Sequence, residues 1–226
     1  MPIHITLAEA DFDDVVLQAI QAIRGGGIAV LAAEQGYMYI CDAFHHDAVS
    51  RIHTLRGDAP FTATQVLVGD ADVLKGLATD FDSEYQTLAS EFWPGPLTIH
   101  LMPHSSLNWD LGDSGQLSEF AVRVPSAKLL REVIRKTGPV AAASASIAGK
   151  APSREIEQIP ASESAIMIYV DEGQLPMGEP SSVIRRSVIG VTGGLELARE
   201  GAISLEKLQA VLPTLTAQAP VEPPVN

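Results

Sequence analysis

The stretch best suited to chemistry runs from Val140 to Lys150 and reads VAAASASIAGK. It predicts a short buried strand that continues into a loop built almost entirely of small residues. Small side chains let the backbone approach a ligand closely, so the loop amides and the hydroxyls of Ser144 and Ser146 can face an anion. The alternative is a tightly packed junction between a strand and a helix. These residues alone leave both interpretations open.

The end of this stretch imitates a phosphate-binding P-loop, whose pattern is G-x-x-x-x-G-K-[ST]. Gly149 and Lys150 supply the last glycine and the lysine. Ser144 stands where the first glycine is required, and Ala151 stands where the metal-binding hydroxyl is required. Pro152 also interrupts the helix that such a loop would open. The sequence therefore excludes a P-loop.

The histidines form no second reactive constellation. His45, His46 and His53 fall on a predicted helix without a supporting set of ligands, and His100 and His104 straddle the end of a predicted strand. No arrangement resembles a Ser-His-Asp or Cys-His group for covalent catalysis. We therefore predict neither a metal site nor a covalent intermediate.

The overall charge is acidic. The chain has 28 acidic and 15 basic residues and a formal net charge of -13. This argues against broad attraction to nucleic acids, which depends on Lys and Arg neutralising phosphates. A local basic groove for RNA remains open, since five cations lie close together in the sequence: Arg123, Lys128, Arg131, Arg135 and Lys136. The alternative for this group is the solvated face of one helix.

Composition places the chain among globular proteins of a reducing compartment. The 226 residues are 46% hydrophobic and 19% charged, which is ordinary for a folded domain. No apolar run approaches the roughly 18 residues of a transmembrane helix, and the N-terminus does not read as a signal peptide. Cys41 is the single cysteine and cannot form an internal disulfide. We expect a cytoplasmic protein without membrane contact.

Helical and strand patterns alternate along the first two thirds of the chain, and strands follow one another afterwards. Helices are predicted around residues 16–23, 48–55, 83–92, 128–136, 155–159 and 205–212. Strands are predicted at residues 3–6, 28–31, 37–41, 65–68, 97–102, 121–124, 140–143, 165–170, 182–186, 188–192 and 195–199. Residues 103–119 read as a long surface loop, and Ser83 with Gln86 reads as a helix capping box. The pattern predicts an α/β domain with a mixed sheet over residues 1–212, followed by a proline-rich disordered tail at 213–226.

Four stretches, in this order and spacing, resemble the YrdC-like family of threonylcarbamoyl-adenylate synthases. They are GGIAVLAAEQGY at 26–37 with Cys41-Asp42-Ala43, FWPGPLT at 92–98, AVRVP at 121–125 with Ser144-Ala145-Ser146, and SSVI at 181–184 with REGAI at 199–203. The tryptophan-containing heptad is the most specific of them. Together they cover roughly residues 10–210.

The resemblance implies a single twisted α/β domain with a mixed parallel and antiparallel sheet, flanking helices and a large concave cavity. Members of the family join ATP, threonine and bicarbonate into threonylcarbamoyl-AMP and pyrophosphate, for the modification of adenosine 37 in certain tRNAs. The fold has also been associated with double-stranded RNA. The implied small-molecule partners are therefore a nucleotide, an amino acid and bicarbonate, with Mg²⁺ accompanying ATP.

The family's binding residues can be carried over where this sequence matches its motifs. The resemblance implies an ATP site at Arg56, Ser144, Ser146 and Arg199. It implies a threonine site at Arg123, Ser181 and Tyr37. No residue is assigned a catalytic role.

Three of the departures from the family's pattern fall on binding positions. Ala33 replaces a threonine that helps to hold the amino acid, and Ser146 replaces the asparagine of Ser-x-Asn. Asp58 replaces the arginine of Lys-x-Arg, and a carboxylate about 5 Å from a phosphate would add about 3 kcal/mol of repulsion at an effective dielectric near 20. Asp58 either holds a Mg²⁺ that bridges the phosphates or turns away to pair with a neighbour.

These departures leave three functional hypotheses. The first is a working threonylcarbamoyl-AMP synthase. The second is a diverged paralogue, similar to YciO, with altered or weak activity, and the departures favour it. The third is a non-catalytic protein that binds a nucleotide or double-stranded RNA. Related carbamoyltransferase domains adenylate a carbamoyl group without threonine, which keeps altered substrate choice open.

Overall fold

The sequence folds around one large mixed sheet. The computed structural model describes residues 1–116, 118–160, 165–187 and 193–218. The helices are α1 (Phe12–Arg24), α2 (His46–Arg56), α3 (Ser83–Phe92), α4 (Lys128–Thr137) and α5 (Leu205–Val211), with the short 3-10 helices η1 (Leu7–Glu9), η2 (Ala71–Gly76) and η3 (Ile156–Gln158). The strands are β1 (Ile3–Thr6), β2 (Ile28–Ala32), β3 (Tyr37–Asp42), β4 (Gln65–Leu67), β5 (Leu97–Leu101), β6 (Phe120–Arg123), β7 (Val140–Ser144), β8 (Ile166–Asp171), β9 (Ser182–Arg186), β10 (Leu195–Arg199) and β11 (Thr216–Ala217).

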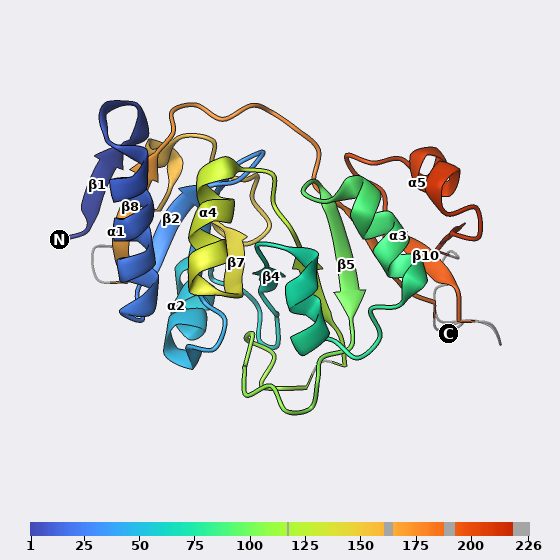
Figure 1. Ribbon diagram of the computed structural model, residues 1–226. Coiled ribbons are helices and arrows are strands. Elements are labelled where there is room, and N and C mark those ends of the chain that lie inside the picture. The colour runs from blue at the N-terminus through green and yellow to red at the C-terminus, as the bar shows by residue number, and fades with distance from the viewer. Residues whose placement is uncertain (117, 161–164, 188–192, 219–226) are drawn as a thin grey trace, which may run out of the picture.

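The strands join in the order β1-β8-β2-β3-β7-β4-β6-β5-β9-β10-β11 (Figure 1). Parallel and antiparallel pairs alternate irregularly, because short turns join some neighbours and helices join others. For example, β2 and β3 form an antiparallel hairpin, whereas β4 lies parallel to β6 and β5 lies parallel to β9. The predicted α/β fold with a twisted mixed sheet and flanking helices is confirmed.

Two hydrophobic clusters cover opposite faces of the central strands. Alternate residues of a strand point to opposite faces, so Val30 contributes to one cluster while Ala29 and Leu31 contribute to the other. Helices α1 and α4 pack side by side on the second of these faces (Figure 1). Helices α2, α3 and α5 belong to the first cluster. Of the described helices, none combines the length and apolar character that crossing a bilayer requires.

Local signals place most of the helices correctly. Helix α1 begins after Asp11, whose carboxylate accepts hydrogen bonds from the amides of Asp13 and Asp14, and it ends at Gly25. Helix α2 ends at Gly57, which adopts a left-handed φ of 65°. The predicted strand at 188–192 lies outside the described residues.

The predicted capping box of α3 is wrong. The N-cap is Asp82 rather than Ser83, and its carboxylate accepts hydrogen bonds from the amides of Glu84 (3.1 Å) and Tyr85 (3.3 Å). The side-chain amide of Gln86 instead donates to the carbonyl of Phe81 at 3.0 Å. A carboxylate one residue earlier competes successfully because an anion also interacts favourably with the positive end of the helix dipole.

The described fold also continues beyond the predicted boundary at residue 212. Leu215 is buried, and Thr216–Ala217 forms β11, which lies parallel to β10. Leu215 supplies apolar surface within a stretch whose overall composition is polar and proline-rich, so the predicted tail includes an anchored segment. Residues 219–226 of that tail lie outside the described residues. The middle of the predicted 103–119 surface loop is likewise anchored, since Leu111 and Asp113 are buried.

The observed cap can be tested by comparing two adjacent substitutions. Asp82→Ala should lower the free energy of unfolding by about 1–2 kcal/mol, because two amides of α3 lose their acceptor and Arg186 loses an ion-pair partner. Ser83→Ala should change it by less than about 0.5 kcal/mol. Urea unfolding of both variants measures the difference. An equal loss in the two variants would restore the capping box, and Asp82→Asn should retain most of the stability.

Candidate functional site

A cavity of about 270 Å³ opens where the middle strands of the sheet meet the turn between β2 and β3. We call it the site cavity, and it is lined by Ala33, Glu34, Gln35, Gly36, Met38, Gln65, Arg123, Ser144, Pro152, Pro180, Ser181 and Arg199. The chain brings these residues together because β3, β7, β4, β6, β5, β9 and β10 follow one another in the sheet. Four of the seven predicted binding residues therefore share one cavity: Arg123, Ser144, Ser181 and Arg199.

The small-residue stretch forms β7 and the loop after it. Ser144 ends the strand and lines the site cavity. Ser146 is 5% exposed, and its hydroxyl has no hydrogen-bond partner among the described residues. A buried hydroxyl without a partner is costly, so this position suits a bound polar group. Ser146 is not among the residues that line the site cavity.

Arg56 binds the backbone of this loop. Its guanidinium donates hydrogen bonds to the carbonyl oxygen of Ser144 and, at 3.2 Å, to that of Ser146. Its own carbonyl accepts the amide of Ala148 at 2.8 Å. Arg56 thus lies outside the lining of the site cavity, and its charge is directed toward the protein's own backbone.

Asp58 turns toward neighbouring side chains. Its carboxylate lies 3.0 Å from Nε of Arg56 and 2.9 Å from Nδ1 of His53, and its side chain is 5% exposed. Nε2 of His53 lies 2.9 Å from the carbonyl oxygen of Leu111, which ties the buried part of the 103–119 loop to the same cluster. Of the two alternatives for Asp58, the pairing with neighbours is the one that the structure contains.

A second ion pair lies inside the site cavity, between Arg123 and Glu34. Nη1 of Arg123 is 2.9 Å from a Glu34 oxygen, and the other Glu34 oxygen accepts the amide (2.6 Å) and hydroxyl (3.0 Å) of Ser126. Burial alone would raise the pKa of Glu34, but the charge of Arg123 and the hydrogen bonds from Ser126 outweigh it and hold the pKa below its ordinary value. Both side chains are largely buried. The charge of Arg123 is therefore already paired with Glu34 when a ligand enters the cavity.

A chain of polar side chains crosses one wall of the cavity. The amide nitrogen of Gln65 lies 3.1 Å from the hydroxyl of Thr98, which lies 2.8 Å from the hydroxyl of Ser181. The Arg199 guanidinium donates to the carbonyl oxygen of Ser181 at 2.8 Å. Among the described lining residues, Arg199 has no carboxylate within ion-pair distance. Its charge is therefore the one most available to an anionic ligand.

Tyr37 lies away from the other predicted threonine-binding residues. Its hydroxyl donates to the carbonyl oxygen of Gly173 at 2.8 Å and accepts the amide of Glu172 at 2.9 Å. Asp171 lies 3.2 Å from the same hydroxyl. The side chain is fully buried, and burial raises the pKa of the phenol. Tyr37 ties β3 to the end of β8 and does not line the site cavity.

Glu34, Gln65 and Thr98 belong to the site but are not among the residues predicted from the sequence. Glu34 and Thr98 lie within the quoted family motifs but carry no signal that tells a lining residue from a packed one. Gln65 gives a detectable signal, because it is the polar first residue of an otherwise apolar strand. Nothing in the sequence, however, shows that β4 lies close enough to Thr98 for contact.

The donor set does not fit a Mg²⁺ ion held by the protein. The described residues contain no group of three or more His, Cys, Asp or Glu side chains that could hold a metal. Asp58 is engaged by Arg56 and His53, and Glu34 by Arg123 and Ser126.

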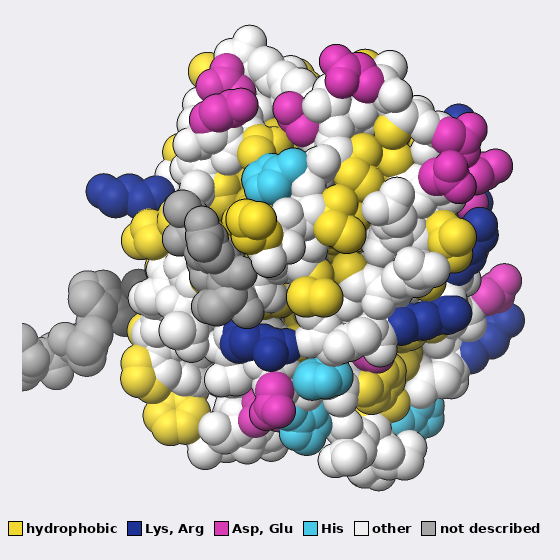
Figure 2. Space-filling view, turned by 90° about the vertical axis from the view of Figure 1, so that its left-hand side faces the viewer, with side chains coloured by type: hydrophobic (Ala, Val, Ile, Leu, Met, Phe, Trp, Pro, Cys, Tyr) yellow, Lys and Arg dark blue, Asp and Glu magenta, His cyan; other side chains and the backbone are white. Residues whose placement is uncertain are grey.

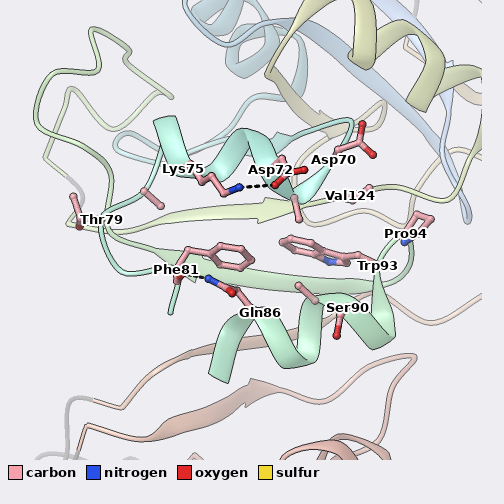
Figure 3. A pocket seen from close by; sticks show the side chains of 13 residues that line it. Asp70, Asp72, Lys75, Thr79, Phe81, Gln86, Ser90, Trp93, Pro94 and Val124 are labelled. Atoms are coloured by element: carbon pink, nitrogen blue, oxygen red, sulfur yellow. Dashed lines mark hydrogen bonds and ion pairs between the residues drawn. The ribbon is translucent and has the colours of Figure 1, made fainter. Parts of the chain in front are cut away.

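A second cavity, of about 410 Å³, lies between η2 and α3 (Figure 3). The rings of Phe81 and Trp93 lie side by side in it, with centroids 6.3 Å apart and planes inclined by 15°. Lys75 pairs with Asp72 at its edge. Of the predicted binding residues none lines this cavity, and its charged groups are already paired, Lys75 with Asp72 and Asp70 with Arg135, so we place the candidate site at the site cavity instead.

Comparison with known proteins identifies the family. The sequence model of the Sua5/YciO/YrdC family matches residues 21–201. The description of that family model reads "Telomere recombination". The chain belongs to this family. A threonylcarbamoyl-AMP synthase of Pyrococcus abyssi is 30% identical over 193 residues, which is 84% of this chain and 55% of the relative. A Mycobacterium tuberculosis relative, named provisionally for the same activity, is 29% identical over 198 residues and covers 87% of this chain and 88% of the relative.

Solved structures of the Sua5/YciO/YrdC family share the fold. Sua5 of Pyrococcus abyssi complexed with L-threonine has a TM-score of 0.81 at 25% identity, over 96% of this chain and 62% of that chain. YciO of Escherichia coli has a TM-score of 0.72 at 20% identity, over 92% and 98% of the two chains. The likeness to YciO concerns the fold alone. The predicted family is confirmed.

The ion pair of Glu34 predicts a pH-dependent contribution to stability. The folded pKa of Glu34 lies below its ordinary value of 4.5, so its contribution is fully present above about pH 4.5 and is lost as the pH falls through the folded pKa. The unfolding free energy of Glu34→Gln should be lower than that of the wild type by about 2 kcal/mol at pH 7. The two proteins should converge in acid. The exposed Glu157→Gln variant should show no such pH dependence.

The position of Asp58 predicts a structural role. Asp58→Ala leaves the Arg56 guanidinium without its carboxylate, so urea unfolding should show a loss of about 3 kcal/mol. Asp72→Ala, which breaks an exposed ion pair with Lys75, should leave stability unchanged. Mg²⁺ should raise the unfolding temperature of the wild type no more than that of Asp58→Asn. A Mg²⁺-dependent gain that disappears in Asp58→Asn would instead make Asp58 a metal ligand.

Proposed function

We propose that this protein is a threonylcarbamoyl-AMP synthase whose affinity for ATP is lowered by ion pairs within the protein. The observation that carries the proposal is the convergence of Arg123, Ser144, Ser181 and Arg199 on one cavity. Each of these residues falls on a motif shared with the family, and they come from four different strands or strand ends. The similarity to an L-threonine complex of Sua5 supports an amino acid as one of the ligands.

The polar groups of the site cavity suit a zwitterionic amino acid. Arg123 and Glu34 place a cation and an anion 2.9 Å apart, which complements the carboxylate and the ammonium of a free amino acid. Ser181 and Arg199 add donors on the adjacent wall. Ala33 and Met38 supply apolar surface where a short side chain can lie. The cavity is small enough to favour short side chains.

The proposed reaction has two bond-forming steps. The threonine nitrogen forms a bond to the carbon of bicarbonate with loss of water, which gives a carbamate. A carbamate oxygen then forms a bond to the α-phosphorus of ATP, and the bond from that phosphorus to pyrophosphate breaks. The chain's contribution is to hold the amino acid and to place Arg199 near the developing charge.

The weakness of the site follows from its cations. Arg56, the predicted ATP-binding cation, is paired with Asp58 and with backbone carbonyls. Each charge-assisted hydrogen bond to a phosphate contributes roughly 1.5–3 kcal/mol. Without this contact, ATP affinity would fall by about one to two orders of magnitude. We therefore expect turnover that needs a high ATP concentration.

RNA binding stays a prediction and receives little support from the side chains. Arg135 pairs with Asp70 and Glu132, and Lys128 lies 4.8 Å over the ring of Phe12. The face seen from the β1 edge mixes acidic, basic and apolar side chains without a continuous basic field (Figure 2). A nucleotide-binding protein without turnover remains the alternative, and Arg199, the lining cation with no carboxylate partner among the lining residues, is the observation that favours it.

The activity can be measured directly. The protein should convert ATP, threonine and bicarbonate to pyrophosphate and an adenylate product, with a high KM for ATP. Ser181→Ala should lower kcat/KM for threonine at least about tenfold, because the site loses a hydroxyl donor. Ser90→Ala, in the second cavity, is the matched control and should behave as the wild type. No adenylate product at high enzyme and ATP concentrations would overturn the proposal, and ATP binding without product would favour the non-catalytic alternative.

A further inference from the structure

The polar chain of the cavity wall has a defined chemical order. Gln65 on β4, Thr98 on β5 and Ser181 just before β9 are joined by contacts of 3.1 Å and 2.8 Å. Nη2 of Arg199 reaches the same Ser181 hydroxyl at 3.4 Å. Gln65, Ser181 and Arg199 line the site cavity, whereas Thr98 is buried behind them with 4% of its surface exposed.

The Gln65 nitrogen fixes the hydrogen-bond direction of this chain. An amide nitrogen can only donate, so the Thr98 oxygen accepts from Gln65 and must direct its own hydrogen elsewhere. Within the described residues, the acceptor in reach of that hydrogen is the Ser181 oxygen. The reverse direction would leave a buried Thr98 hydrogen without a partner, which disfavours it on the order of tenfold or more.

The direction determines what Ser181 offers to a ligand. Its oxygen accepts hydrogens from Thr98 and from Arg199, so both lone pairs are used. Its own hydrogen has no acceptor among the described residues and is free to point into the site cavity. The group that meets Ser181 is therefore a hydrogen-bond acceptor. The adjacent Arg199 charge favours an anionic oxygen.

We propose that Gln65 is a positioning residue that, through Thr98, makes Ser181 a hydrogen-bond donor to an anionic oxygen of the ligand. The identification of that oxygen with the carboxylate of an amino acid rests on the proposed function. A phosphate oxygen of the nucleotide has the same chemistry. The alternative role for Gln65 is a direct contact with the ligand, since its side chain also lines the cavity.

The exchange rates of the two hydroxyl hydrogens test the direction without any ligand. Deuterium isotope shifts on the ¹³Cβ resonances of labelled Thr and Ser report whether each hydroxyl exchanges slowly or rapidly with solvent. Thr98 should exchange slowly and Ser181 rapidly, because one hydrogen is buried in a hydrogen bond and the other faces the cavity. A slowly exchanging Ser181 hydroxyl in the wild type would overturn the proposal.

Two substitutions of matched length at position 65 extend the test. Gln65→Glu replaces the donor with an acceptor, so Thr98 should turn toward Glu and accept from Ser181, whose hydroxyl should become slowly exchanging. Gln65→Met removes the hydrogen bond without offering an acceptor, and Ser181 should remain rapidly exchanging. Unchanged exchange of Ser181 in Gln65→Glu would contradict the relay.

Binding of threonine and of AMP, measured separately by calorimetry, identifies the oxygen that Ser181 meets. Gln65→Glu should bind one of the two ligands at least tenfold more weakly than Gln65→Met does. In a Ser181→Ala background this difference should shrink to threefold or less, because the hydroxyl through which residue 65 acts on the ligand is then absent. A difference of the same size in that background would show that residue 65 acts on the ligand directly and would overturn the relay.

The two proposals fail in distinguishable ways. A wild-type protein that binds neither threonine nor ATP, but shows slow Thr98 and rapid Ser181 exchange, would overturn the proposed function and support the relay. A protein that forms the adenylate product, but whose Ser181 hydroxyl exchanges slowly, would do the opposite.

Discussion

The contacts of the largely buried Arg56 guanidinium are the interactions on which the candidate site most depends. They join the end of α2, the carboxylate of Asp58 and the carbonyls of the loop after β7. His53 extends the same cluster to Leu111, in the long connection between β5 and β6. A loop of small residues has few side-chain contacts of its own, so its shape must be imposed from outside. Arg56 and Asp58 impose it.

Charge neutralisation inside the protein explains both the order of the site and its limits. Asp58 and Glu34 keep Arg56 and Arg123 in fixed positions, which preorganises the cavity walls. The same carboxylates reduce the positive potential that an ATP triphosphate would meet. Arg199, which donates to the carbonyl oxygen of Ser181, is left to face the ligand. The carboxylates that make this cavity rigid therefore also lower its affinity for anions.

Much of the fold could be predicted because its signals are local. Apolar spacing located α1 and α2, and glycines after each of them marked where they end. The cap of α3 was misplaced because Asp82 and Ser83 are both good caps, and sequence alone does not decide between neighbours. The anchored Leu215 was missed because a single buried leucine in a proline-rich stretch has no periodicity.

The site was predictable only in part, for a different reason. Family motifs located Arg123, Ser144, Ser181 and Arg199, and the structure brings them together. Arg56 and Tyr37 point elsewhere because their partners, Asp58 and the segment after β8, lie close to them only in the folded chain. The link between Gln65 and Ser181 depends on the order of β4, β6, β5 and β9, which no local pattern encodes.

The position of β8 has a consequence for how the chain is made. This strand lies between β1 and β2, which are adjacent in sequence, and it pairs Ile3 with Ile168. At a ribosome, β1 and one edge of β2 are therefore synthesised long before the strand that joins them. During that interval β1 and this edge of β2 have no hydrogen-bonded neighbour. The N-terminal part of the sheet is completed only when residues 166–171 have been synthesised. Unpaired strand edges thus persist longer at this end of the protein than at the hairpin of β2 and β3, whose strands are synthesised one after the other.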